Sequence, residues 1–86
     1  MTGDSYDVDD PPEDPDDGHR QRRRRHDAHE RAAGTHERAA NVHEDAASVF
    51  ERHDRPESAR REHELAEAER EKAENAHRAA AEELEK

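Results

Sequence analysis

The sequence contains no cysteine, no tryptophan, and one residue each of tyrosine and phenylalanine. The lack of cysteine excludes disulfide bonds and thiolate chemistry, so cysteine usage says nothing about the redox compartment. Serine occupies three positions, and no glycine-rich phosphate loop is present. Too few large apolar side chains remain to enclose a pocket that shifts pKa values or excludes water. We therefore expect a protein that is not an enzyme.

Long hydrophobic runs are also missing from the chain. No segment approaches the length of apolar sequence that a membrane span or the core of a signal peptide requires. We therefore expect a soluble, cytoplasmic protein with no membrane partner.

Charge and alanine dominate what is present. Charged residues make up 47% of the 86 residues and hydrophobic residues 27%, fifteen of them alanine, and the net charge is −10. Full burial of a larger apolar side chain contributes about 1.5–3 kcal/mol, whereas ordering one residue costs about 1–2 kcal/mol of backbone entropy. A single copy should be marginally stable, so we expect a homo-oligomer or a partner protein. The larger apolar residues of the expected helical region are Val42, Val49, Phe50, Leu65 and Leu84.

The first part of the chain divides by charge. Residues 1–19 carry eight acidic side chains, three prolines and no lysine or arginine, which predicts a disordered acidic tail. Residues 20–26 form a basic segment with five arginines, which the acidic tail should attract. Such arginines can contact phosphate. The acidic net charge and the lack of interleaved aromatic residues nevertheless argue against a nucleic-acid partner.

A seven-residue repeat, His-Glu-Arg-Ala-Ala, begins at residues 29 and 36 and recurs at residue 43 with aspartate in place of arginine. Its spacing predicts a helix over about residues 27–53. Within it, alanine, threonine and valine residues alternate at spacings of three and four, which is typical of a coiled-coil seam. The members of this predicted seam are Ala32, Thr35, Ala39, Val42, Ala46 and Val49.

Pro56 predicts the start of a second helix over about residues 56–85, after a turn at 54–55 in which Asp54 is a candidate N-cap. Two long helices joined by so short a turn must fold back on each other. We therefore predict an all-α fold, an alanine-rich, coiled-coil-like antiparallel two-helix hairpin over residues 27–86, with Ala46 near Ala66. The predicted helix–helix interface comprises Ala32, Ala39, Val42, Ala46, Val49, Phe50, Ala59, Leu65, Ala66, Ala73, Ala80 and Leu84.

Eight histidines make metal binding an alternative to a purely structural role. Imidazole is a good ligand for zinc, nickel and copper. His26 and His29 are one helical turn apart, and Glu74 with His77 has the Glu-x-x-His spacing of di-iron bundles. The histidines of the repeat, however, lie about 10 Å apart along a helix, too far to share an ion. The main expectation is no cofactor, and weak Zn, Ni or Cu binding at these four residues is the alternative.

The same histidines predict a response to pH. Because histidine titrates near pH 6.5, protonation of all eight would change the net charge from −10 to −2. If His36, His43, His63 and His77 flank the helix contact, acid should weaken the contact by mutual repulsion. Alternatively, nearby glutamates pair with the new charges and acid strengthens the contact.

The segment from His29 to about Ala80 resembles a group of small, uncharacterised His/Ala/Glu-rich proteins of high-GC bacteria. The resemblance rests on the repeat, on Phe50-Glu51-Arg52-His53 before a proline turn, and on the Glu/Arg/Ala-rich helix that follows. It implies a helical hairpin and no activity, ligand or catalytic residue.

Three hypotheses about function follow from the sequence. The leading one is a non-enzymatic helical module for oligomerisation or for protein–protein interaction. The alternatives are histidine-mediated binding or buffering of divalent metal, and a conditionally disordered hydrophilic protein whose association depends on pH.

Overall fold

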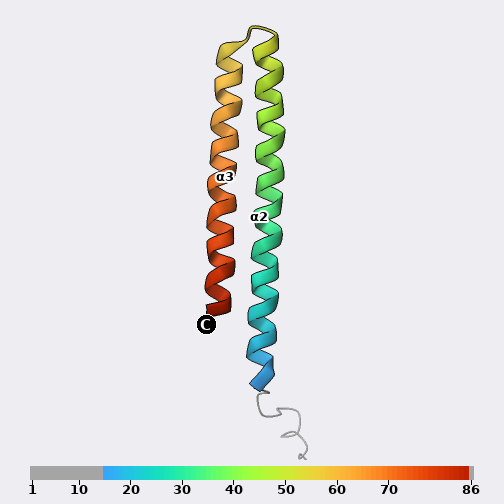
Figure 1. Cartoon of the computed structure of the whole chain (residues 1–86), viewed down its shortest axis with the longest axis vertical. Coiled ribbons are helices and arrows are strands. Elements are labelled where there is room, and N and C mark those ends of the chain that lie inside the picture. The colour runs from blue at the N-terminus through green and yellow to red at the C-terminus, as the bar shows by residue number, and fades with distance from the viewer. Residues whose placement is uncertain (1–14, 86) are drawn as a thin grey trace, which may run out of the picture.

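The protein folds as two antiparallel α-helices in the computed structural model, which describes residues 15–85 (Figure 1). Helix α2 spans Pro15–Arg52 and helix α3 spans Pro56–Glu85. No strand occurs among the described residues. The predicted all-α antiparallel hairpin is therefore confirmed. Residues 1–14, which make up most of the predicted acidic tail, lie outside the described part of the chain.

Helix α2 begins at Pro15, well before the predicted start at residue 27. Proline suits a first helical turn, whose amide groups have no helical partners, and Asp16 and Asp17 are favourable at the positive end of the helix dipole. Asp17 also accepts a hydrogen bond of 3.1 Å from the Gln21 side chain. Arginine has high helix propensity, so the basic segment at 20–26 continues the helix. The basic segment therefore lies within α2, and the helix predicted to begin at about residue 27 begins at Pro15.

The buried apolar part of the contact between the two helices is made of alanine. Seven alanines, spaced seven residues apart on each helix, are 0–3% exposed, and they are the buried hydrophobic residues of the described chain. Such small side chains let the helix axes approach toward the short end of the usual ~8–10 Å range. These residues, here called the alanine seam, are Ala33, Ala40 and Ala47 on α2 and Ala59, Ala66, Ala73 and Ala80 on α3.

On α2 this seam lies one residue C-terminal to the predicted one. Ala32 is exposed, and Ala39 and Ala46 are half-buried. Val42 is 64% exposed and Val49 42% exposed, so the predicted placement of these two valines in the hairpin contact is wrong. Of the other residues predicted at the interface, Phe50 is half-buried, Leu65 and Leu84 are exposed, and Ala59, Ala66, Ala73 and Ala80 are buried.

The shift has a physical reason in the partner helix. Helix α3 presents Glu62 and Glu69 toward the seam, where they contact His43 and His36 of α2. Each histidine follows a seam alanine by three residues, which places it on the same face of α2. Packing through the valine-containing stripe would leave the two carboxylates in the contact without partners, which costs free energy.

The same two contacts define the register. His43 faces Glu62 and His36 faces Glu69, so a step toward the N-terminus of α2 matches a step toward the C-terminus of α3. Ala66 therefore lies level with Ala40, and its predicted pairing with Ala46 is wrong. As Figure 1 shows, the beginning of α2 extends past the end of α3.

The turn ends α2 through a Schellman motif. Asp54 adopts a left-handed conformation with φ of 59°. The Arg55 amide donates to the Phe50 carbonyl at 2.8 Å, and the Asp54 amide donates to the Glu51 carbonyl at 3.2 Å. The Arg55 carbonyl accepts the first bond of α3, from the Ala59 amide at 3.0 Å. Arg55 thus occupies the N-cap position, and the prediction that Asp54 does so is wrong.

Candidate functional site

One flank of the hairpin carries two interlocking columns of charged side chains. Helix α3 contributes cations at positions seven residues apart, and α2 contributes glutamates with the same spacing. Because residues seven apart lie on one face of a helix, the columns run along the whole contact. We call this set the histidine–glutamate ladder; its members are His63, Arg70 and His77 on α3, and Glu30, Glu37, Glu44 and Glu51 on α2.

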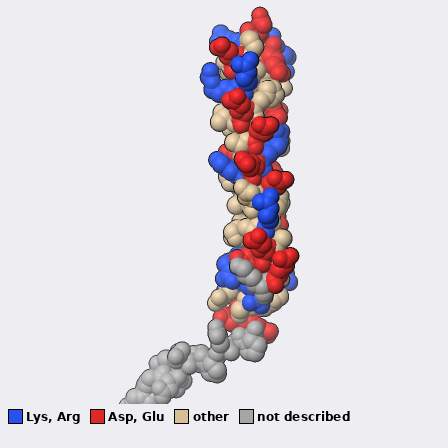
Figure 2. Space-filling view, turned by 90° about the vertical axis from the view of Figure 1, so that its left-hand side faces the viewer, with Lys and Arg blue, Asp and Glu red and all other residues tan. Residues whose placement is uncertain are grey.

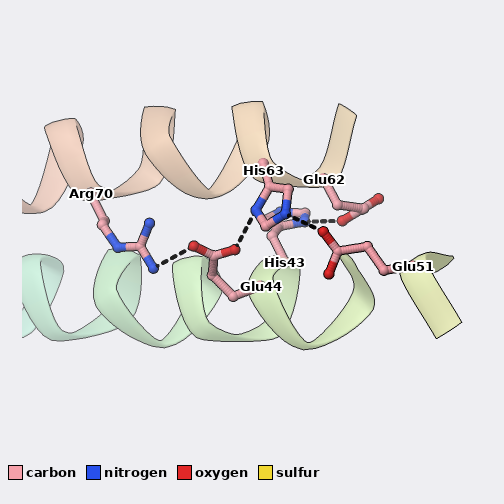
Figure 3. Close-up of polar contacts among 6 residues, drawn as sticks. All are labelled: His43, Glu44, Glu51, Glu62, His63 and Arg70. Carbon is pink, nitrogen blue, oxygen red and sulfur yellow. Dashed lines mark hydrogen bonds and ion pairs between the residues drawn. The ribbon is translucent and has the colours of Figure 1, made fainter. Parts of the chain in front are cut away.

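His63 lies between two glutamates of the ladder (Figure 3). Its Nδ1 atom is 2.6 Å from Glu44 Oε1, and its Nε2 atom is 3.2 Å from Glu51 Oε2. Arg70 holds the other oxygen of Glu44, with 2.9 Å between Nη2 and Oε2. The three contacts join two turns of α3 to two turns of α2.

His77 repeats the arrangement farther from the turn. Its Nδ1 atom is 2.9 Å from Glu30 Oε1, and its Nε2 atom is 3.1 Å from Glu37 Oε2. Both histidines therefore face a carboxylate with each ring nitrogen. A neutral imidazole carries one N–H, and an ionised carboxylate only accepts, so only the protonated ring donates both hydrogen bonds. The geometry of each site thus matches the imidazolium form.

Two further histidines contact α3 at the seam itself. His36 Nδ1 is 2.6 Å from Glu69 Oε1, and His43 Nδ1 is 2.7 Å from Glu62 Oε1. Their side chains are about one third exposed or less, and Lys72 lies 3.5 Å from the second oxygen of Glu69. Each ring uses one nitrogen, which a neutral imidazole can satisfy as a donor. The seam histidines therefore position the helices, whereas those of the ladder also require a proton.

The pKa values of the ladder follow from these contacts. Hydrogen bonds to Glu51 and then to Glu44 raise the pKa of His63 above its ordinary value. The hydrogen bond to Glu37, followed by the charges of Glu30 and Glu37, raises the pKa of His77.

The carboxylates shift in the opposite sense. The hydrogen bond from Arg70, followed by that from His63, lowers the pKa of Glu44. The hydrogen bond from His36, followed by the charge of Lys72, lowers the pKa of Glu69. The folded hairpin therefore favours ionised glutamate beside protonated histidine.

The far end of the hairpin is tied by the basic segment. Arg25 Nε donates to Glu83 Oε1 at 2.9 Å, and Glu83 is buried. His26 Nδ1 lies 3.0 Å from the Ala80 carbonyl oxygen, which accepts a hydrogen bond when that nitrogen carries the proton. Part of the arginine block thus holds the two helices together.

The structure does not bring the four candidate metal ligands together. His26 contacts Ala80, and His77 contacts the glutamates of α2. Glu74 forms an ion pair with Arg78 of its own helix, at 3.9 Å. Across residues 15–85, no three or more His, Cys, Asp or Glu side chains form a group that could hold a metal ion.

The surface along α3 carries acidic and basic side chains mixed over its length (Figure 2). One depression on it is an open groove lined by four glutamates, Ala68 and Arg70. In the described region, neither helix is long and apolar enough to cross a membrane.

The ladder was only partly visible in the sequence. His36, His43, His63 and His77 were expected to flank the contact, but their glutamate partners were not identified. The signal was present as the seven-residue spacing of Glu30, Glu37, Glu44 and Glu51, which matches that of the α3 cations. Recognising it required the correct register, which the misplaced α2 seam concealed.

No protein-family model, no curated protein and no solved structure matches this chain.

Proposed function

We propose that the protein is a non-enzymatic helical interaction module whose hairpin is stabilised by protonation of histidine. The observation that carries this proposal is the position of His63 and His77, each between two glutamates of the opposite helix. Such a bridge forms fully only when the ring is charged. Acid should therefore close the hairpin, and alkaline conditions should loosen it.

The weak apolar core makes the hairpin responsive to these contacts. The buried hydrophobic residues among positions 15–85 are all alanine, and isolated helices are marginal in water without packing of larger side chains. Polar contacts across the seam therefore contribute a large share of the free-energy difference between the closed and the open hairpin. Acid also reduces the net charge toward −2, which lowers self-repulsion of the compact form.

The charged groups that contact the two rings favour the protonated state. Helix α2 presents Glu44 and Glu51 to His63, and Glu30 and Glu37 to His77. The one cation of the ladder between them, Arg70, is bound to Glu44. The alternative in which acid opens the hairpin by mutual repulsion of histidines finds no support in this arrangement.

Thermal unfolding followed by circular dichroism at pH 5.5 and pH 8.0 tests the proposal. We expect a higher melting temperature at pH 5.5, and loss of most of this gain in the variant His63→Gln/His77→Gln. The matched control is His19→Gln/His53→Gln, which removes two exposed histidines and should retain the gain. Equal stability at both pH values, or greater stability at pH 8.0, would overturn the proposal.

A further inference from the structure

Helix α2 carries a second continuous uncharged face beside the alanine seam. Its residues follow the alternating spacing of three and four that defines a coiled-coil contact. No lysine, arginine, aspartate or glutamate occupies this face over three seven-residue repeats. We call it the uncharged stripe; its members are Ala28, Ala32, Thr35, Ala39, Val42, Ala46 and Val49.

The uncharged stripe lies on the flank of the hairpin opposite the ladder. Successive helical residues are about 100° apart. Glu44 follows Ala40 by four residues, which turns it about 40° to one side of the seam, and Ala46 precedes Ala47 by one residue, which turns it about 100° to the other side. The same reasoning on α3 places Leu65, one residue before Ala66, on the flank away from His63.

Three large apolar side chains are therefore exposed together on this flank. Val42 is 64% exposed, and Val49 and Leu65 are each 42% exposed. The register places Leu65 level with the segment Ala40–Val42, because Glu62 faces His43. On α3, Lys72 holds the same position relative to the seam as Leu65, and Arg61 lies one turn before Leu65. The apolar part of this flank therefore consists of the stripe on α2 and of Leu65 on α3, and the hairpin itself leaves it uncovered.

The outer margins of this face carry opposite charges on the two helices. Beside the stripe, α2 has Arg31, Arg38, Asp45 and Arg52, a net charge of +2. At the corresponding positions α3 has Glu57, Glu64, Glu71, Arg78 and Glu85, a net charge of −3. Within residues 15–85, Arg31, Arg38, Glu64 and Glu71 form no ion pair, and the Arg38 guanidinium donates a hydrogen bond of 3.4 Å to Thr35 of its own helix. One chain thus supplies both halves of a complementary pair.

We infer that a second copy of the chain covers this face, with α2 of each copy packed on α3 of the other and both turns at the same end. This inference rests on the proposed interaction function and names its partner. A twofold axis parallel to the helices produces the arrangement, because it places α2 of each copy beside α3 of the other. The basic margin then meets the acidic margin twice, and Val42, Val49 and Leu65 are buried where α2 of one copy packs on α3 of the other, in a bundle of four helices.

Sedimentation equilibrium at pH 5.5 tests the presence of the dimer. The 9.9 kDa chain should have twice that mass, and Val42→Glu/Val49→Glu should weaken association by roughly 100-fold, because each new carboxylate would be buried against apolar surface. The matched control is Asn41→Glu/Ser48→Glu, which adds the same charge to exposed positions one residue away, on the other side of α2. The control should remain dimeric.

Mixing of charge-reversed variants tests the arrangement. Arg31→Glu/Arg38→Glu and Glu64→Arg/Glu71→Arg should each dimerise more weakly than the natural chain, because like charges then face each other. An equimolar mixture should recover association as a heterodimer, because each helix α2 meets an α3 of opposite charge. If α2 packed on α2 of the partner, the natural chain would already place like charges together, and neither variant alone would dimerise more weakly than the natural chain.

A monomer at every concentration, a dimer insensitive to Val42→Glu/Val49→Glu, a larger assembly, or failure of the mixture to associate would each overturn the inference. Helicity measured on the same samples separates this result from failure of the proposed function. If the chain is a monomer but acid still stabilises its hairpin, the inference of a dimer is wrong and the proposed function stands.

Discussion

The Glu69 carboxylate of α3 lies 2.6 Å from Nδ1 of His36 on α2, at a seam position where a coiled coil ordinarily has an apolar side chain. Burying such a polar pair adds little net stability, because desolvation offsets much of the attraction. Its effect is on register, because a shift of the helices would break the contact and leave the His36 ring without its carboxylate partner. The alanine seam alone would tolerate such a shift, since every layer presents the same methyl groups.

Stability should pass through a maximum between about pH 4.5 and 6.5, the ordinary pKa values of glutamate and histidine. The raised pKa of His63 and His77 gives a contribution that is complete below pH 6.5 and is lost as pH rises through the folded-state values. The lowered pKa of Glu44 and Glu69 gives a second stabilising contribution. It is present above pH 4.5 and is lost as pH falls through the folded-state pKa values of these glutamates.

Melting temperatures measured by circular dichroism from pH 3 to pH 9 check this profile. The same series in 1 M salt should show a flatter maximum, because salt screens exposed charges. A monotonic rise of melting temperature with pH would contradict the histidine limb, and a monotonic fall would contradict the glutamate limb.

Ala76→Glu should stabilise the hairpin by supplying a missing seam pair. Ala76 occupies the position seven residues after Glu69, and the register places it opposite His29, just as Glu69 faces His36. A partly exposed ion pair contributes about 0.2–1 kcal/mol, so chemical denaturation at pH 5.5 should show a gain of that size. Ala76→Gln is the control for side-chain length, and equal gains in both variants would exclude a charge effect.

Ala66→Leu should destabilise the hairpin, because Ala66 is fully buried where the helices approach closely. Inserting larger side chains into a well-packed contact typically costs about 1–3 kcal/mol. The control, Ala81→Leu, adds the same atoms at an exposed position of α3 and should leave the free energy of unfolding nearly unchanged. Equal stability of both variants would show that the alanine seam is not closely packed.

Asp54→Gly should stabilise the turn. Asp54 adopts the left-handed conformation, with φ of 59°, which costs a residue with a side chain more than it costs glycine. Part of the gain is offset by the greater freedom of glycine in the unfolded chain, so the expected net effect is up to about 1 kcal/mol. Asp54→Ala should bring no gain, and a loss of stability in the glycine variant would refute the role assigned to this residue.

The sequence predicted the hairpin, the turn at Pro56 and the second helix because these depend on strong local signals. The seam of α2 was misassigned because the repeat contains adjacent alanines, so two heptad phases fit equally well. The larger side chains of Val42 and Val49 favoured the wrong phase. The choice between the phases depends on the Glu62 and Glu69 carboxylates of α3, which belong to another segment of the chain.

The most direct test of the account follows the ring nitrogens of His63 and His77 by nitrogen-15 NMR as pH is varied. We predict that both nitrogens of each ring carry protons at pH 6.5, and that the titration midpoints lie above those of the same histidines in short unfolded peptides. Rings that are neutral at pH 6.5, with midpoints at or below the peptide values, would contradict the central claim that protonated histidine bridges the two helices.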